Sequence, residues 1–220
     1  MSKPTRIFLV DDHPVVRERL AEIIAEESDF VVCGQAEDVP QALKWMSQIP
    51  TDLAVVDLGL KNSSGMDLVK EVRSEFPHVQ VLVVSMYDET IWAERAIRAG
   101  ARGYVNKQEA TKNIVTAIRR ILAGEVYLSA ELEHRLAARM ADQAGQKTAT
   151  GIELLTDREL QVFDLIGQGF NSRQIADRLR VDISTVDTYR ARIKEKLNYR
   201  DASELLQHAI AWVHSRPPRQ

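Results

Sequence analysis

Carboxylates follow two short apolar runs in the first half of this 220-residue chain. Asp11 and Asp12 come directly after the run Ile7–Val10, and Asp57 comes directly after Leu53–Val56. Crowded carboxylates repel one another, and a divalent cation relieves that repulsion. Oxygen ligands with open coordination positions suit Mg²⁺, which keeps waters and bridges to phosphate. The three aspartates together predict a magnesium site, whereas helix capping remains the alternative for Asp11 or Asp12 taken alone.

A hydroxyl and an ammonium group follow two further apolar runs. Ser85 ends the run that contains Val81–Val84, and Lys107 follows Gly103–Val105. Both side chains can bind phosphoryl oxygens when they lie beside the carboxylates. Taken alone, Ser85 is a routine residue at a strand end and Lys107 a routine solvated one. Together with the aspartates they predict a phosphoryl site.

The elements that position these residues alternate between two patterns. Short runs rich in Val and Ile, without period-2 alternation, are typical of strands buried in a parallel sheet. The predicted strands are Ile7–Val10, Phe30–Cys33, Leu53–Val56, Val81–Val84 and Gly103–Val105. The predicted amphipathic helices between and after them are Val15–Glu26, Val39–Gln48, Met66–Phe76, Thr90–Ala99 and Thr111–Ala123. Five such units predict an α/β domain: a flavodoxin-like, doubly wound, parallel five-stranded sheet whose ligands bind at the carboxyl ends of the strands.

The second half has a different composition. We predict a domain over 1–124, a linker over 125–153 that combines the helix Ser129–Met140 with a flexible polar stretch, and a small all-helical domain over 154–220. Four helices are expected in this last part, with capping boxes beginning at Thr156, Asn171 and Asp201. Asp182 is expected to cap a further helix, and Asn198 to end it in the left-handed conformation.

The charge balance restricts the classes of partner. The formal net charge is −3, and residues 153–220 carry only one excess positive charge. Nucleic-acid binding by this part must therefore depend on where its charges lie. No apolar run approaches the roughly 20 residues that span a bilayer, and the first residues lack the pattern of a signal peptide. The single cysteine, Cys33, also favours a cytoplasmic protein without membrane partners.

Residues 5–124 resemble the receiver domain of response regulators, through the segments DDHPVVRERL, VVDLGL, VVSMYD and GYVNK. The resemblance implies that Asp57 accepts a phosphoryl group from the histidine of a sensor kinase. It also implies that Asp11 and Asp12 organise Mg²⁺ and that the Gly59 carbonyl is a further ligand. Ser85 and Lys107 would bind the phosphoryl oxygens. Tyr104 would be the aromatic side chain that changes rotamer when Ser85 moves inward.

Three positions near this site need comment. Many receivers carry proline where Lys61 and Gln108 stand here. A cis Lys107–Gln108 bond would cost about 3 kcal/mol or more, so the bond is expected to be trans with adjusted geometry or else a strained cis bond. These departures remove no chemical group, and they bear on the rate of phosphorylation. His13 is interpreted as part of the turn before the first helix, with Pro14 at the first helical position.

Residues 154–213 resemble the LuxR-type helix-turn-helix domain, and both resemblances together indicate the NarL/FixJ subfamily. Asn171–Leu179 would be the supporting helix and Ile183–Leu197 the recognition helix in the major groove. Val186, Ile193 and Leu197 share one face of that helix and are predicted to be buried. The expected DNA-binding residues on it are Ser184, Thr185, Asp187, Thr188, Arg190, Ala191, Arg192, Lys194 and Lys196.

Different roles are expected on the recognition helix. Asp187 and Thr188 are candidates for base readout, because a carboxylate can accept a hydrogen bond from cytosine and a threonine can contact a thymine methyl group. The arginines and lysines are expected to bind phosphates. The last helix, Asp201–Val213, carries Leu205, Ala209 and Trp212 near one face. It either closes the domain core or pairs with a second copy, as it commonly does in LuxR-type proteins.

The sequence therefore predicts a transcriptional response regulator of a two-component system, switched by phosphorylation and without turnover of an external substrate. Its expected partners are a sensor histidine kinase, double-stranded DNA, a second copy of the chain when phosphorylated, and RNA polymerase. One alternative is a DNA-binding regulator that is indifferent to phosphate and keeps a vestigial receiver. The other is an aspartyl-phosphate phosphatase of the haloacid-dehalogenase type, which would need its nucleophile after the first strand.

Overall fold

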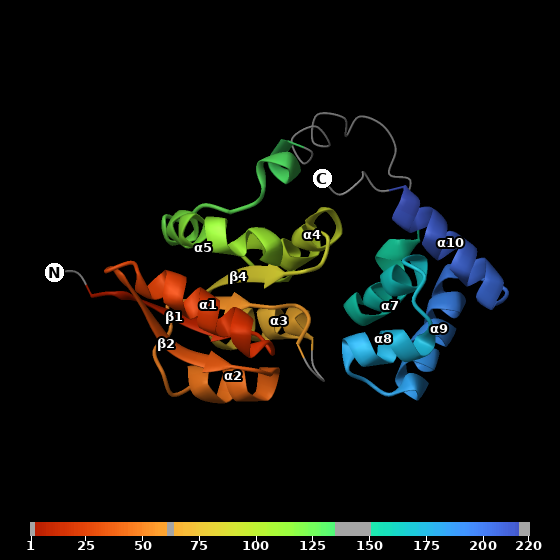
Figure 1. The fold of residues 1–220 in the computed structure, drawn as a ribbon, viewed down its shortest axis with the longest axis horizontal. Helices are drawn as coiled ribbons and strands as arrows, with labels where there is room; N and C mark the ends of the chain where they lie inside the picture. Colours follow the sequence, from red (N-terminus) through yellow and green to blue (C-terminus); the bar gives the residue numbers. More distant parts are fainter. Residues whose placement is uncertain (1–2, 61–63, 135–150, 216–220) are drawn as a thin grey trace. The chain divides into compact units, whose positions relative to one another are not determined.

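The computed structural model describes residues 3–60, 64–134 and 151–215, and it forms two compact units, Met1–Ala144 and Gly145–Gln220 (Figure 1). Each unit is considered by itself. Lys61 and most of the predicted flexible linker lie outside the described residues. Among the helices that are described, none is long and apolar enough to cross a membrane.

The N-terminal unit is built on five parallel strands in the order β2-β1-β3-β4-β5. The strands are β1 Thr5–Val10, β2 Phe30–Ala36, β3 Leu53–Val56, β4 Gln80–Ser85 and β5 Gly103–Asn106. The helices are α1 Pro14–Ala25, α2 Val39–Met46, α3 Gly65–Glu75, α4 Glu89–Ala99 and α5 Lys107–Leu122. The predicted α/β fold and all five strands are confirmed, and this strand order places the ligand site of such folds between the ends of β1 and β3.

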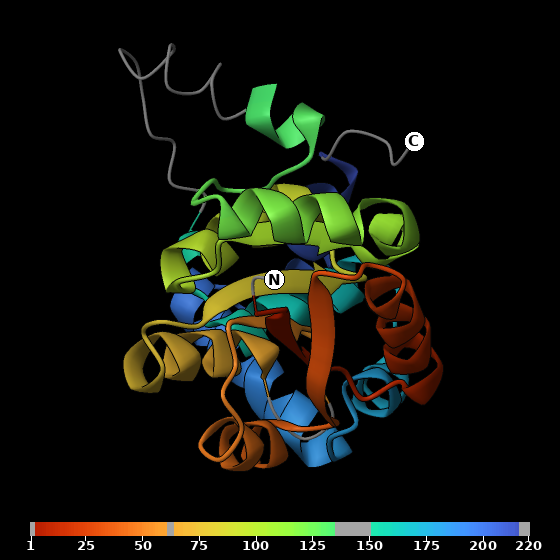
Figure 2. The same ribbon diagram turned by 90° about the vertical axis from the view of Figure 1, so that its left-hand side faces the viewer.

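Helices cover both faces of the sheet, with α1 and α5 on one face and α2, α3 and α4 on the other (Figure 2). The four residues of β3 are all buried, which explains why this strand shows no alternation in the sequence. Side chains from alternate positions of β1, β3 and β4 form one apolar core with α1 and α5. Its strand residues include Ile7, Leu9, Leu53, Val55, Leu82 and Val84. The sheet therefore supplies a rigid base for the loops at its carboxyl edge.

The chain after α5 returns to the edge of the sheet beside β5. Tyr127 forms an isolated parallel bridge with Gly103, and the Tyr104 N–H donates to the Tyr127 carbonyl at 2.9 Å. A Cβ atom at Gly103 would lie 3.0 Å from the Tyr127 Cβ, so glycine permits this approach. Residues 130–134 are helical, as the sequence predicted for the start of the linker helix, and the rest of that helix lies outside the described residues.

Within residues 151–215, the C-terminal unit contains a short 3-10 turn, η1 Ile152–Leu154, and four helices, α7 Asp157–Gly167, α8 Ser172–Leu179, α9 Ile183–Leu197 and α10 Ala202–His214. Its core includes Phe163, whose ring centroid lies 5.4 Å from that of Trp212. A Cβ at Gly167 would lie 2.3 Å from the Ala209 carbonyl oxygen, so α7 and α10 pack with their backbones close together. Leu205 and Ala209 are fully buried, which confirms that this face of α10 closes the domain core.

The helix ends lie where the sequence predicted them, but two of the side-chain caps differ. Both the Thr156–Glu159 and the Asn171–Gln174 capping boxes form, and Asn198 ends α9 at φ 55°. Asp182 is the N-cap residue of α9, as predicted, but its carboxylate accepts no cap hydrogen bond from the described first turn. Asp201 caps α10, whereas Glu204 accepts from the Arg200 N–H and leaves this box incomplete. Cap position is readable from sequence, but the side-chain rotamer that completes a cap is not.

Candidate functional site

The predicted acidic site forms at the carboxyl edge of the sheet. The Asp57 N–H donates to the Val10 carbonyl at 2.8 Å, so the ends of β1 and β3 are held together. Lys107 begins α5 and places its Nζ 2.7 Å from Asp11 Oδ2 and 2.7 Å from Asp57 Oδ2. Asp11, Asp12 and Asp57 are buried. The structure thus brings together carboxylates that are 46 positions apart in sequence and bridges two of them with one ammonium group.

Burial dominates the electrostatics of this cluster. Removal from water raises the pKa of Asp57, an effect that the Lys107 charge opposes and the Asp11 charge reinforces. For Lys107, burial alone would lower the pKa, but the carboxylates of Asp57 and Asp11 together hold it above its ordinary value. Lys107 therefore stays charged, whereas the ionised form of Asp57 is disfavoured by its surroundings. An added cation or the loss of the negative charge would relieve this disfavoured state.

The cluster has the composition of a metal site. One ligand atom from each of Asp11, Asp12, His13 and Asp57 lies within 4.8 Å of the others. Three carboxylates in one buried pocket suit a hard divalent cation such as Mg²⁺. A Cβ at Gly59 would lie 3.4 Å from Asp57 Oδ2, an ordinary contact distance, so Gly59 borders the Asp57 carboxylate. These residues fit a divalent cation beside Asp57.

His13 lies in the turn before α1, and its imidazole contacts the acidic site. Pro14 stands at the first position of α1, as predicted. Its Nδ1 lies 2.8 Å from Asp12 Oδ1 and 3.1 Å from Asp11 Oδ1. The sequence shows that His13 directly follows the two aspartates. Whether its ring turns toward them depends on the side-chain rotamer, which the sequence does not show.

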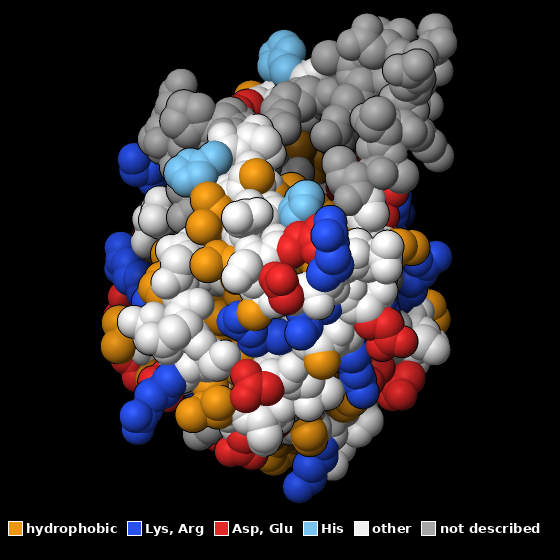
Figure 3. All heavy atoms as spheres, turned by 90° about the vertical axis from the view of Figure 1, so that its right-hand side faces the viewer, with side chains coloured by type: hydrophobic (Ala, Val, Ile, Leu, Met, Phe, Trp, Pro, Cys, Tyr) orange, Lys and Arg blue, Asp and Glu red, His pale blue; other side chains and the backbone are white. Residues whose placement is uncertain are grey.

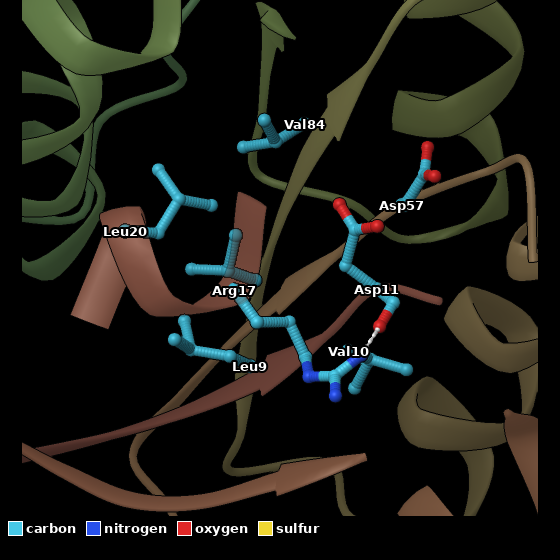
Figure 4. A pocket seen from close by; sticks show the side chains of 8 residues that line it. Leu9, Val10, Asp11, Arg17, Leu20, Asp57 and Val84 are labelled. Carbon is cyan, nitrogen blue, oxygen red and sulfur yellow. Dashed lines mark hydrogen bonds between the residues drawn. The ribbon is translucent and has the colours of Figure 1, made fainter. Parts of the chain in front are cut away.

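Two residues that sequence reasoning missed hold the backbone of the site. Arg17 donates to the backbone carbonyl of Asp11, and Figure 4 shows its guanidinium on the opposite side of Asp11 from Asp57. A Cβ at Gly65 would lie 1.9 Å from the Asp57 carbonyl oxygen, so only glycine allows α3 to begin against Asp57. The apolar side chains Leu9, Leu20 and Val84 line the pocket beneath Asp11. Such backbone contacts depend on tertiary approach, which spacing does not reveal.

The two residues predicted to act as a switch lie on neighbouring strands, Ser85 at the end of β4 and Tyr104 in β5. Ser85 is buried, and its Oγ accepts from the Tyr87 N–H at 3.4 Å. Tyr104 is fully buried, and its hydroxyl donates to the Tyr87 carbonyl at 2.9 Å. Burial raises the pKa of Tyr104 well above its ordinary value, so the hydroxyl remains a hydrogen-bond donor. The Tyr87 ring packs at 5.3 Å from that of Trp92, and this joins the Tyr104 hydroxyl to α4.

The bond between Lys107 and Gln108 is trans, since no cis peptide occurs among the described residues. Of the two alternatives that the sequence left open, the trans bond is therefore observed. Asn106 caps α5 by accepting from the Gln108 N–H at 3.0 Å. This hydrogen bond fixes the start of α5. Lys107 therefore reaches the carboxylates of Asp11 and Asp57 although no proline follows it.

The second predicted site is the outward face of α9. Val186 and Ile193 are fully buried and Leu197 is half-buried, so the predicted inner stripe is largely confirmed. The predicted DNA-binding residues that are exposed are Ser184, Asp187, Thr188, Ala191, Arg192 and Lys196. Those that are half-buried are Thr185, Arg190 and Lys194. Figure 3 shows Lys and Arg side chains interspersed with Asp and Glu, so the side of the molecule in that view is not uniformly basic.

Two of these residues contact other elements of the same unit. Lys196 Nζ lies 2.7 Å from Glu159 Oε2, and that carboxylate also accepts from the Thr156 N–H in the α7 capping box. Although burial favours the neutral acid, Lys196 and Thr156 lower the pKa of Glu159. Asp187 accepts a hydrogen bond from Ser172 of α8 at 3.1 Å. Sequence spacing along α9 alone did not indicate either contact.

Comparison with known families agrees with both domains. Residues 7–119 match the response regulator receiver domain, and residues 153–209 match the bacterial regulatory proteins of the luxR family. The chain is similar to the oxygen regulatory protein NreC of Staphylococcus carnosus, with 28% identity over 93% of this chain and 96% of the relative.

Solved structures are similar as well. A LuxR-family two-component response regulator from Aurantimonas is 31% identical over 63% of this chain and 99% of its own, with a TM-score of 0.59. RcsB of Salmonella typhimurium is 21% identical over 96% of this chain and 98% of its own, with a TM-score of 0.65, and shows the shared fold. RcsB has also been solved as dimers bound to DNA, and that chain is 21% identical with a TM-score of 0.58.

The fold and the two matched domains define a DNA-binding response regulator of a two-component system. The chain belongs to the response regulator family, in its NarL/FixJ-type branch with a luxR-family domain after the receiver. The family consists of DNA-binding regulators, and its partners are kinases and DNA.

Proposed function

We propose that Asp57 is the phosphoacceptor and that its phosphorylation controls DNA binding by α9. One carboxylate oxygen of Asp57 attacks the phosphorus of a phosphohistidine on a sensor kinase, and the bond from phosphorus to the kinase nitrogen breaks. The observation that carries this proposal is the buried Asp57 carboxylate, held 2.7 Å from Lys107 at the β1–β3 edge. The Lys107 ammonium beside this carboxylate would bind an oxygen of a phosphoryl group attached there.

Asp11, Asp12, Asp57 and the Gly59 carbonyl would hold Mg²⁺ in this proposal. The ion, when bound, neutralises charge on the transferred phosphoryl group. Lys107 exchanges part of its contact with Asp57 for a phosphoryl oxygen, and the Ser85 hydroxyl donates to another. Tyr104 then responds to the position of Ser85 through the shared Tyr87 backbone, which joins β4 to α4.

DNA binding is proposed for the outward face of α9, with Ser184, Thr185, Asp187, Thr188 and Ala191 near base edges and Arg190, Arg192, Lys194 and Lys196 near phosphates. The domain boundaries are proposed as 1–124, 125–153 and 154–220. A homodimer of the phosphorylated chain would bind two half-sites, as the RcsB dimers on DNA illustrate for that protein. The protein would act in the cytoplasm, contact RNA polymerase at its promoters, and turn over no external substrate.

Phosphoryl transfer tests the first step directly. The full chain is incubated with acetyl phosphate and Mg²⁺, and its intact mass is measured over time. We expect the mass of one phosphoryl group to be gained by the wild type and by Asp67→Asn, which changes an exposed aspartate on α3. Asp57→Asn should gain none. Mass gain in Asp57→Asn equal to the wild type would exclude Asp57 as the acceptor.

The two alternatives give different results in the same experiment. A vestigial receiver gains no mass in any variant, and the DNA-binding function would then stand alone. A phosphatase releases inorganic phosphate from added phosphate esters in amounts that exceed the protein many times. The buried Lys107 between Asp11 and Asp57 favours the switch, because it matches a site that retains a phosphoryl group.

A further inference from the structure

Asp187 is the acidic residue among those proposed to contact DNA, and a neighbouring helix holds its side chain. The supporting helix α8 packs against α9 in the C-terminal unit (Figure 1). Ser172, the first residue of α8, donates a hydrogen bond from its Oγ to Asp187 Oδ1 at 3.1 Å. Ser172 is half-buried and Asp187 is exposed. The bond therefore ties a carboxylate that is open to solvent to the edge of the contact between the two helices.

The start of α8 favours a negative charge at this place. The unpaired N–H groups in the first turn of a helix give that end a partial positive charge, which attracts a carboxylate. A hydroxyl that donates to an ionised acceptor also forms a stronger hydrogen bond than one between neutral groups. Within residues 151–215, no lysine or arginine forms an ion pair with Asp187. Ser172 is therefore the side chain that fixes the direction of this carboxylate.

The other candidate for base readout is held in a different way. Thr188 Oγ1 donates to the Ser184 carbonyl at 2.9 Å, one turn earlier in α9. This bond lies within a single helix, so it forms wherever α9 forms. The Asp187 carboxylate depends instead on a serine that lies 15 positions earlier, in another helix. Removal of the Ser172 hydroxyl would therefore free Asp187 while Thr188 keeps its hydrogen bond.

One oxygen of Asp187 remains available to a base. Ser172 occupies Oδ1, and Oδ2 accepts no hydrogen bond from the described residues. A carboxylate oxygen in the major groove accepts from the N4 amino group of cytosine, whereas thymine presents only an acceptor and a methyl group there. With Oδ1 bound to α8, Oδ2 has a fixed position relative to α9. Without that bond, the side chain would distribute over the three staggered rotamers of its first torsion.

We propose that Ser172 is a positioning residue for base readout, whose hydroxyl fixes the Asp187 carboxylate in the orientation that selects cytosine. This inference rests on the proposed DNA-binding function of α9 and names the base that Asp187 prefers. Ser172 acts on the reading side chain, so its loss lowers selectivity and leaves the phosphate contacts of α9 in place. Because one rotamer of three remains productive, selectivity for cytosine over thymine should fall about threefold.

Selection from a pool of random duplexes tests this role with the full chain. The protein binds the pool in Mg²⁺, in separate samples with and without beryllofluoride, and the bound duplexes are sequenced. Asp187→Ala identifies the position that Asp187 reads, as the one whose cytosine preference is lost. At that position, Ser172→Ala should lower the ratio of cytosine to thymine about threefold. Ser172→Thr keeps a hydroxyl and should retain the wild-type ratio.

The matched control is Ser203→Ala, which removes an exposed serine hydroxyl from the first turn of α10 in the same unit. It should leave the ratio of cytosine to thymine as in the wild type. Circular dichroism checks that each variant folds.

A double substitution distinguishes positioning from a structural role. In a chain that already carries Asp187→Ala, Ser172→Ala should have no further effect on base preference, because no carboxylate is left to place. A serine that only stabilises α8 would instead change the affinity for all duplexes equally in both backgrounds. Competition between two duplexes that differ at the one position measures the total affinity and the ratio together.

Several results would overturn the proposal. They are an unchanged ratio of cytosine to thymine in Ser172→Ala, an equal fall in Ser203→Ala, and a fall in Ser172→Thr as large as that in Ser172→Ala. The absence of any position at which Asp187→Ala removes a cytosine preference would overturn it as well.

The selection also separates this proposal from the proposed function. If the wild type selects sequences that Ser172→Ala selects equally, α9 reads DNA without Ser172, and only this inference fails. If the wild type selects the same sequences equally with and without beryllofluoride, control by Asp57 fails and the role of Ser172 is still measured. If the wild type enriches no sequence in either sample, DNA recognition by α9 fails and this inference fails with it.

Discussion

The two units of this response regulator differ in whether their charged candidate residues are buried or exposed. In the receiver, Lys107, Asp11 and Asp57 have side chains that are 7%, 5% and 4% exposed, and the one ammonium group contacts both carboxylates. On α9, the side chains proposed to contact DNA lie at or near the surface, with Arg192 exposed and Lys194 half-buried. Burial shifts pKa values and strengthens the interaction of each charge with its neighbours, so a change of one charge affects the whole pocket. Exposed charges can bind a polyanion with little structural reorganisation. The comparison explains how one chain combines chemistry and recognition.

Lys196 is an exception to this contrast between buried and exposed charges. It lies on α9 but forms an ion pair with the buried Glu159 of α7. We expect Lys196→Met to destabilise the C-terminal unit by about 1–3 kcal/mol, since Glu159 would be left as a buried charge without its cation. Hydrogen exchange of the α7 amides in the full chain measures this change.

Lys194→Met removes the same charge from the same helix and serves as the control, with a smaller expected effect on stability. Glu159→Gln combined with Lys196→Met should recover part of the loss. If Lys194→Met and Lys196→Met destabilise α7 equally, the pair with Glu159 contributes nothing specific, and Lys196 belongs with the exposed DNA contacts.

Asp57 provides the corresponding test in the receiver. Its pKa is raised by burial, so its contribution to stability is fully present below the ordinary pKa of aspartate and is lost as pH rises through the raised value. In the absence of divalent cations at pH 7, Asp57→Asn should therefore raise stability by on the order of 1 kcal/mol, or about 2–4 °C in melting temperature. Calorimetry between pH 4 and 7 measures the difference.

The exposed Asp67→Asn is the matched control and should not alter the pH dependence. A melting temperature of Asp57→Asn that falls below the wild type at pH 7 would show that ionised Asp57 stabilises the pocket. The contrast between buried and exposed charges would then fail at its principal residue.

Arg192 represents the exposed charges of α9. Loss of one phosphate contact should reduce the dependence of log affinity on log salt concentration by about 0.9 and weaken binding to all sequences alike. Arg192→Ala is therefore expected to lower DNA affinity severalfold at physiological salt without altering the stability of the receiver. Fluorescence anisotropy with duplexes at several salt concentrations measures both quantities. An unchanged salt slope would remove Arg192 from the phosphate contacts.

The sequence was sufficient for the fold and for the residues gathered at its carboxyl edge. Parallel strands end at one edge, so the positions of Asp11, Asp57 and Lys107 after apolar runs already implied that they meet. The outcomes that were missed depend on tertiary approach or on rotamers. Neither the turn of the His13 ring nor the pairing of Lys196 with Glu159, 37 positions away, is encoded in local spacing.

DNA binding by the full chain, with and without beryllofluoride as a phosphoryl mimic at Asp57, most directly tests the link between the two units. The chain is titrated with fragments of its genome in the presence of Mg²⁺, and Asp57→Asn is measured in parallel. We expect tighter and more selective binding by the wild type with the mimic, and no response in Asp57→Asn. Equal selective binding with and without the mimic would preserve DNA recognition by α9 and contradict its control by Asp57.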